Sequence, residues 1–297
     1  MLAGAGAYLA WGLFPLFFHR LRSTGAVEIL GHRILWSFVT VAVVLAVLRR
    51  PGGFATLRAD RRRALRIALA AVLLATNWLV YVWAVNADHV VDAALGYFIN
   101  PLVSVALGVF VLKEQLRRAQ RWAVALGAAS VVVLTVGYGR LPWIALVLAA
   151  TFGAYGYLKK TIVLDDAVAS MAAESAVLLP LTLVGFGLAL TVGDGVAFGS
   201  QGAGNVLLLL ATGPITALPL VLFGTAARRI PLTWLGLLQY LTPVGQFLCG
   251  VLVFHESVPP ARFAGFALVW AALVVLAVDA VRQLRPSAAA EPVGAAR

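Results

Sequence analysis

The sequence predicts an all-α integral membrane protein with ten transmembrane helices, and three observations support this. First, 62% of the 297 residues are hydrophobic and 12% are charged, whereas a soluble domain is about half apolar and about a quarter charged. Second, apolar runs of about 17–25 residues, the length that spans a bilayer, recur along the whole chain. Third, Lys and Arg gather between alternate runs. We place the spans at roughly 3–18, 27–48, 66–86, 92–112, 121–138, 141–158, 171–192, 204–226, 232–254 and 263–281.

The distribution of basic residues predicts the orientation of these spans. If the N-terminus is cytoplasmic, all but five of the 23 Lys and Arg residues lie in cytoplasmic connections or in the C-terminal segment. This asymmetry follows the positive-inside rule. It also explains the net charge of +11 without a nucleic-acid partner, because the charges face anionic lipid. Residues 285–297 are small and polar, so we expect a short disordered cytoplasmic tail.

Two halves of the chain repeat each other. A shift of 142 positions aligns Pro101 with Pro243 and Glu114 with Glu256, together with four apolar or glycine pairs. We therefore expect a first repeat over 1–138 and a second over 141–281, each with five spans. Because five is odd, tandem copies enter the membrane in opposite directions, which is the inverted-repeat arrangement of alternating-access transporters.

Each aligned segment carries a proline, which we expect to break the helix, beside a stripe of polar residues. The stripe residues stand at i, i+3 and i+7 and so share one helix face. Proline-interrupted apolar segments at matching places in two halves are typical of a transporter's binding site. The candidate substrate-binding residues on these stripes are Tyr97, Asn100 and Ser104 in the first half and Gln239, Thr242 and Gln246 in the second.

Other polar residues inside predicted spans allow two interpretations each, since a charge at mid-membrane usually faces a cavity or a partner. Glu28 and His32 share a face of the second span. They are candidates for proton coupling, or they form a local pair, as Glu28 and Arg33 could, that holds the start of the helix while the arginine reaches toward water.

The third and seventh spans leave the same kind of choice open. Asn77 and Tyr81 share a helix face and either line a solute path or hydrogen-bond between helices. Glu174 either carries a coupling proton or is interfacial and solvated.

The sequence also lacks features that other functions require. Cys249 is the single cysteine, so neither an intrachain disulfide nor a cysteine-based metal site can form. Walker A, HExxH and GxSxG motifs are absent from the sequence. We therefore predict no enzyme activity, no catalytic residue, no cofactor and no metal site.

Several strings resemble the RarD-type branch of the EamA transporters, within the drug/metabolite transporter superfamily. They include AYLAWGLFP (7–15), EILGHRILWS (28–37), NWLVYVWAVN (77–86), LGYFINPLVSVALG (95–108) and LGLLQYLTPVGQFLCGV (235–251). The resemblance covers nearly the whole chain and implies two inverted five-helix EamA repeats in the bacterial inner (plasma) membrane. The branch's recurring positions correspond here to Glu28, His32, Arg33, Asn77, Trp83, Asn100, Pro101, Glu174, Gln239, Tyr240, Pro243 and Gln246.

These observations together predict a secondary transporter that moves a small organic solute, with efflux as the expected direction. A mixed amide, hydroxyl and aromatic lining suits an amphipathic metabolite better than an inorganic ion. The expected partners are the solute and the lipid bilayer. A passive channel and a non-transporting membrane sensor remain the alternatives.

Overall fold

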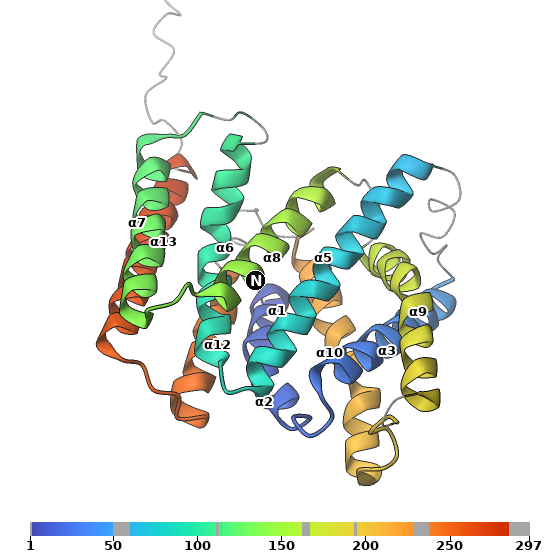
Figure 1. Cartoon of the computed structure of the whole chain (residues 1–297). Helices are drawn as coiled ribbons and strands as arrows, with labels where there is room; N and C mark the ends of the chain where they lie inside the picture. The colour runs from blue at the N-terminus through green and yellow to red at the C-terminus, as the bar shows by residue number, and fades with distance from the viewer. Residues whose placement is uncertain are drawn as a thin grey trace, which may run out of the picture.

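The computed structural model describes residues 2–49, 60–110, 113, 115–161, 167–192, 195–227 and 238–284, and all the regular structure in them is helical (Figure 1). The predicted all-α class is thereby confirmed. The helices are α1 (Leu2–Gly12), α2 (Phe14–His19), α3 (Ala26–Val47), α5 (Arg61–Asn86), α6 (Val90–Phe110), α7 (Arg118–Tyr138), α8 (Trp143–Thr161), α9 (Ala167–Thr191), α10 (Gly202–Ala227), α12 (Leu241–Leu248), a π-helical turn η1 (Cys249–Val253) and α13 (Pro260–Leu284).

The described helices have the lengths and surfaces of membrane spans. Eight helical segments, with α1 and α2 counted as one, are long and apolar enough to cross a bilayer, while Trp143–Lys159 and Leu241–Val253 are shorter apolar helices. In α9, Leu181 is 72% exposed and Leu190 is 63% exposed, whereas Glu174 and Ser175 are buried. Apolar groups outside and polar groups inside reverse the pattern of a soluble protein and suit a lipid solvent.

Helices from the two halves of the chain pack against each other throughout the core. α1 packs on α10 and α12, α3 packs on α9 and α10, and α6 packs on α8 and α12. α5 packs on α8 and α9, while α7 and α13 lie side by side at one edge of the molecule (Figure 1). Because α1 to α7 come from the first half, most of the large helix contacts join the two halves.

The helix break does not lie at the prolines where the sequence predicts it. α6 runs without interruption through Pro101, so the predicted break is wrong there, because neighbouring elements can compensate for the one hydrogen bond that a proline removes. Pro243 lies in the first turn of α12, where a backbone N–H has no helical partner anyway. The break occurs instead between α1 and α2, next to Pro15.

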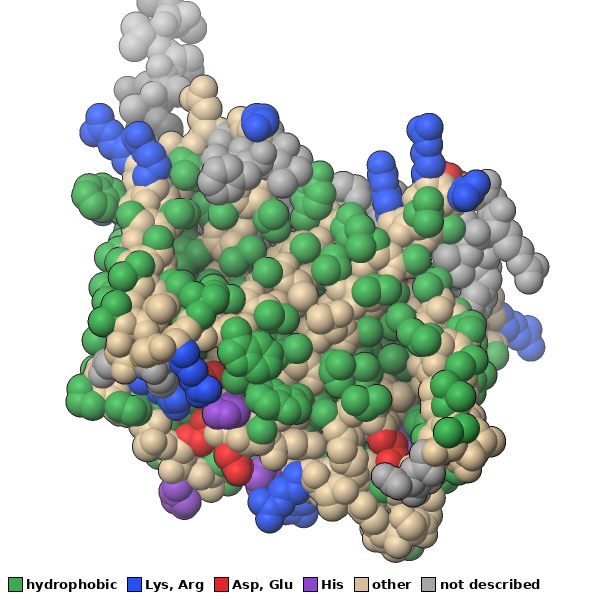
Figure 2. Space-filling model, in the orientation of Figure 1, with side chains coloured by type: hydrophobic (Ala, Val, Ile, Leu, Met, Phe, Trp, Pro, Cys, Tyr) green, Lys and Arg blue, Asp and Glu red, His purple; other side chains and the backbone are tan. Residues whose placement is uncertain are grey.

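Charged residues separate between the two ends of the helices. Figure 2 shows many of the visible Lys and Arg side chains at one end and most of the visible Asp, Glu and His side chains, with some Lys or Arg, at the other. The second end includes a contact of 4.0 Å between His19 Nδ1 and Asp88 Oδ1. There Glu256 also accepts hydrogen bonds from the backbone N–H groups of Val90 and Val91, at 2.6 and 2.9 Å. This carboxylate therefore caps the N-terminus of α6 from the other half of the chain.

Candidate functional site

The polar stripe of the second half lies against the broken helix of the first. Thr242 Oγ1 donates to the carbonyl of Tyr8 at 2.9 Å, and Gln246 Nε2 donates to the carbonyl of Trp11 at 3.3 Å. The Trp11 carbonyl has no helical donor because the residue four positions on is Pro15, which lacks an N–H. Gln246 therefore stabilises a carbonyl that the break before Pro15 leaves without a helical donor, and Thr242 adds a bond to a carbonyl about one turn earlier in α1.

A close approach of the two backbones brings the stripe within reach of α1. A Cβ added to Gly245 would lie 3.0 Å from Gly12 Cα, which is tighter than ordinary van der Waals contact. Cys249 Sγ lies 3.8 Å from the Gly12 carbonyl and donates a weak hydrogen bond to it. Glycine at both positions therefore lets α12 approach α1 closely enough for its side chains to hydrogen-bond to the carbonyls of α1.

The polar stripe of the first half meets α5 and α8. Tyr97 Oη donates to Asn77 Oδ1 at 3.0 Å, and Asn77 Nδ2 donates to the Leu148 carbonyl and to Thr151 Oγ1, both at 3.0 Å. Asn77 is 1% exposed, so its amide ties three helices together in the interior. This geometry matches the interhelical hydrogen-bonding interpretation of Asn77.

The remaining stripe residues are Asn100, Gln239 and Ser104. Asn100 lies next to α8, where a Cβ added to Gly153 would be 3.5 Å from its Oδ1 atom. Gln239 is half-buried immediately before α12. Ser104 occupies a position of α6, but its side chain lies outside the description.

Several buried polar atoms of the helices have no hydrogen-bond partner among the described residues, and three of them come from three different helices of the interior. These three are Arg33 Nη1 on α3, Tyr81 Oη on α5 and Gln246 Oε1 on α12. The three side chains are 3%, 2% and 2% exposed. A buried polar group without a partner forgoes about 1–3 kcal/mol, so an added hydrogen-bond partner would stabilise each of these atoms.

Arg33 occupies an aromatic surrounding that the sequence did not identify. Its guanidinium carbon lies 4.0 Å from the ring centre of Trp78, 5.1 Å from that of Phe18 and 5.6 Å from that of Phe14. Arg33 Nε donates to Thr216 Oγ1 at 3.1 Å. The side chain thus points into the interior and neither pairs with Glu28 nor reaches toward water, as sequence reasoning had allowed.

Glu28 and His32 form a separate network toward the end that carries Asp, Glu and His. His32 Nδ1 accepts from Trp36 Nε1 at 3.2 Å, so a neutral His32 carries its proton on Nε2. That Nε2 lies 3.6 Å from Glu28 Oε1. Glu28 also accepts from the backbone N–H groups of Ala197 and Phe198, at 2.9 and 3.0 Å. The arrangement matches the predicted local pair of Glu28 and His32.

Glu174 is buried and paired, rather than solvated at the interface. Its carboxylate accepts from Lys159 Nζ at 2.6 Å and from Tyr155 Oη and Ser170 Oγ at 3.1 Å. The ammonium of Lys159 also contacts Ser170. One cation and two hydroxyl groups therefore surround the Glu174 side chain.

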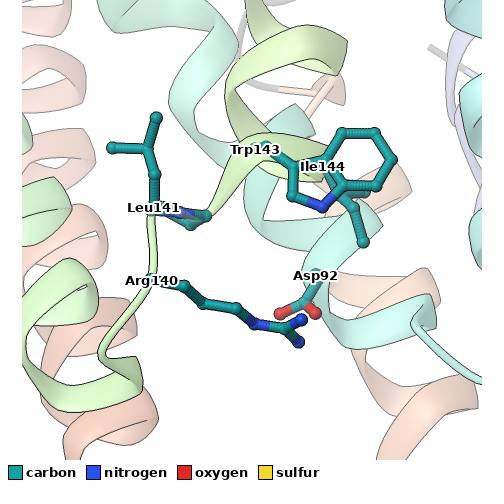
Figure 3. A pocket seen from close by; sticks show the side chains of 6 residues that line it. Asp92, Arg140, Leu141, Trp143 and Ile144 are labelled. Atoms are coloured by element: carbon teal, nitrogen blue, oxygen red, sulfur yellow. The ribbon is translucent and has the colours of Figure 1, made fainter.

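A surface pocket lies at the other end of the helices from Glu174. It is lined by Asp92, by Arg140 and by Leu141, Pro142, Trp143 and Ile144 at the start of α8. In Figure 3 the side chains of Asp92 and Arg140 point toward each other across it. None of the six predicted stripe residues lines this pocket. In the part of the chain that the structure describes, no group of three His, Cys, Asp or Glu side chains could hold a metal ion.

Known proteins are similar to this chain in sequence and in fold. A family model described as the EamA-like transporter family matches residues 1–136. Protein RarD of Streptomyces exfoliatus is 54% identical over 289 residues, which cover 97% of this chain and 91% of that protein. The uncharacterized transporter YojE of Bacillus subtilis (strain 168) is 41% identical over 286 residues, covering 95% of each chain.

A solved structure, described as a crystal structure of a protein, supports the same fold. It matches with a TM-score of 0.62 at 17% sequence identity and covers 96% of this chain and 98% of that one. Identity of this extent to RarD along nearly the whole length decides the family, which is one of transporters and not of enzymes. The chain therefore belongs to the EamA-like transporter family as a homologue of RarD.

Proposed function

We propose that this protein is a secondary transporter that exports a small organic solute across the bacterial inner membrane by alternating access. The observation that carries the proposal is a set of buried polar atoms that have no partner in the described ranges and come from both halves of the chain: Arg33 and Tyr81 from the first half, Gln246 from the second. Polar groups inside a bilayer are costly and typically mark a solute path.

The proposed mechanism requires two inverted repeats, over 1–138 and 141–281, and the helix packing supports them. Under the shift of 142 positions, α1 corresponds to α8, α3 to α9, α5 to α10 and α6 to α12. The contacts of α1 with α10 and α12 then correspond to those of α8 with α5 and α6. The α3–α10 contact likewise corresponds to the α9–α5 contact. Two related packings of such repeats would open the central site to either side in turn.

We further propose that both termini are cytoplasmic. Support comes from the positive-inside rule and from the separation of basic side chains from acidic and histidine side chains (Figure 2). Cysteine-accessibility labelling tests this. A cysteine at the exposed position Arg62 should react only in permeabilised cells, and one at the exposed position Ser200 should react in intact spheroplasts.

For proton coupling, the pair of Glu28 and His32 is the better candidate among the three predicted residues. His32 is buried between the rings of Phe186 and Phe198, each with its centre 4.9 Å away. A change of charge on His32 would therefore disturb the packing of α3 against α9. Glu174 already has Lys159 as its counter-ion at 2.6 Å, which favours a structural role.

Reconstitution of the purified protein in liposomes tests the proposed function. Saturable solute flux that an opposing solute gradient accelerates would support a carrier. Linear, non-saturable flux would identify a channel, and solute binding without flux would identify a sensor. The Gln246→Leu variant should lose flux, whereas the lipid-facing Leu181→Ala variant is the matched control and should retain it. Flux in right-side-out and inside-out vesicles tests the direction.

A further inference from the structure

Arg33 is a buried cation that has no anion to balance it among the described residues. It is 3% exposed, and within the described part of the chain its Nε donates a hydrogen bond to the hydroxyl of Thr216. The only carboxylate near it in sequence, Glu28, lies five positions earlier and faces the backbone of residues 197 and 198. An arginine stays protonated in proteins, so the charge persists.

Two other arginines of the described chain, Arg117 and Arg262, do have carboxylate partners. Arg117 forms an ion pair with Asp279 at 2.9 Å, and Arg262 forms one with Asp92 at 3.5 Å. Both pairs lie near helix ends, where water and lipid head groups also screen charge. Arg33 is the buried member of this set, yet it is the one without a carboxylate partner, which suggests that its partner is a ligand.

The residues around Arg33 suit a solute that has an anionic group next to an apolar part. Trp78, Phe14 and Phe18 lie around the guanidinium, and the Tyr81 ring packs edge-on to Phe18 with 6.1 Å between ring centres. Cation–π contacts of this kind stabilise a desolvated guanidinium by about 0.5–2 kcal/mol each. They do not neutralise it.

The contact with Thr216 orients the side chain for recognition. Nε is held by Thr216 on α10, and Nη1 has no hydrogen-bond partner among the described residues. The hydroxyls of Ser37, one turn along α3, and of Tyr81 are also buried without partners among those residues. Two N–H donors and two hydroxyl groups match the hydrogen-bonding capacity of a carboxylate.

We propose that Arg33 binds the carboxylate of the transported solute, and that the solute is a small organic acid whose body packs on Trp78, Phe18 and Tyr81. This inference rests on the proposed transport function and names its substrate class. A carboxylate carries the single charge that one guanidinium neutralises, whereas a phosphate dianion would leave excess negative charge buried.

Matched acid and amide pairs test this proposal with the purified full-length protein in nanodiscs. The probes are benzoate, phenylacetate and 3-phenylpropionate, each compared with its uncharged amide by isothermal titration calorimetry. For at least one pair we expect the acid to bind the wild type about tenfold or more tightly than the amide, as one charge-assisted hydrogen bond provides. Arg33→Gln should reduce that ratio to about one, Arg33→Lys should retain part of it, and the control Arg262→Gln should keep it.

The wild-type comparison stands even if Arg33→Gln fails to fold. Equal binding of acid and amide in every pair, or no acid binding at millimolar concentration, would overturn the proposal. Retention of the full acid preference in Arg33→Gln would overturn it as well. If the protein transported only neutral or cationic solutes, the proposed acid site would be refuted and the proposed transport function would stand. If acids bound in an Arg33-dependent way but no solute were transported, the proposed transport function would be refuted and the proposed acid site would stand.

Discussion

Replacement of Gly213 by alanine should separate α3 from α10 and destabilise the protein. A Cβ at this position would overlap the carbonyl of Trp36 and lie 2.7 Å from Thr40 Oγ1. The obstructing atoms of Trp36 are backbone, so they cannot rotate aside as a side chain would. Overpacking of a close contact typically costs about 1–3 kcal/mol, while alanine in place of a helical glycine returns about 0.5–1 kcal/mol.

Gly185 provides a matched control for this change. It is also inside a helix, and a Cβ there would meet nothing within 4 Å. The gain in helix propensity is common to both alanine variants and cancels in the comparison. The difference between them, about 1–3 kcal/mol, therefore measures the clash alone.

Thermal unfolding in one fixed detergent, followed by tryptophan fluorescence, would measure this difference. At about 2–4 °C per kcal/mol, the apparent Tm of Gly213→Ala should lie about 5 °C below that of Gly185→Ala. Equal transition temperatures for the two variants would refute the close approach of α3 and α10. The same displacement should lengthen the 3.1 Å bond from Arg33 Nε to Thr216 Oγ1 and reduce solute flux.

Three further changes probe the polar interior and the capped end. Asn77→Leu should lower the free energy of unfolding by about 1–3 kcal/mol because it leaves the Tyr97 hydroxyl unpaired; adding Tyr97→Phe should restore part of the loss, and a further loss in the double variant would contradict this. Lys159→Gln strands a buried carboxylate and should destabilise by about 3–5 kcal/mol, with Glu174→Gln rescuing it; no rescue in denaturation curves would count against the pair. Burial raises the pKa of Glu256 to about 7. Protonated Glu256 is therefore favoured in the folded state, so its contribution to stability is full below the ordinary glutamate pKa and is lost as the pH rises toward about 7. Glu256→Gln should flatten the dependence of the apparent Tm on pH between about 5 and 7.5, and an unchanged slope would refute that assignment.

Several elements of the fold could be predicted because bilayer thickness dictates helix length. The predicted span 27–48 corresponds to α3 at Ala26–Val47, and the predicted span 171–192 to α9 at Ala167–Thr191. The missing proline N–H does not by itself decide where a helix ends, because the chain breaks near Pro15 but α9 and α10 continue through Pro180, Pro214 and Pro219. The break predicted at Pro101 failed because neighbouring helices decide whether a helix continues past a proline.

The partners of polar side chains could not be predicted, since they depend on how distant helices are rotated and paired. Periodicity places His32 and Arg33 on adjacent stripes of one helix, but it does not say which stripe faces the interior. Both are buried because α3 is covered by α9 on one side and by α10 on another. The sequence signal for Arg33 is an arginine at the seventh position of the predicted span 27–48, and an end-of-helix residue that reaches toward water is one of the interpretations that the sequence allows.

The hydrogen bonds from α12 to the interrupted first helix bear on how the protein is made. Thr242 and Gln246 reach Tyr8 and Trp11 across separations of 234 and 235 residues. α1 is synthesised first, so the Trp11 carbonyl, which has no helical donor, stays unpaired during biogenesis until nearly the whole polypeptide has left the ribosome. An N-terminal half expressed alone would leave this carbonyl without its donor from α12, and co-expression with the C-terminal half should protect it from membrane proteases.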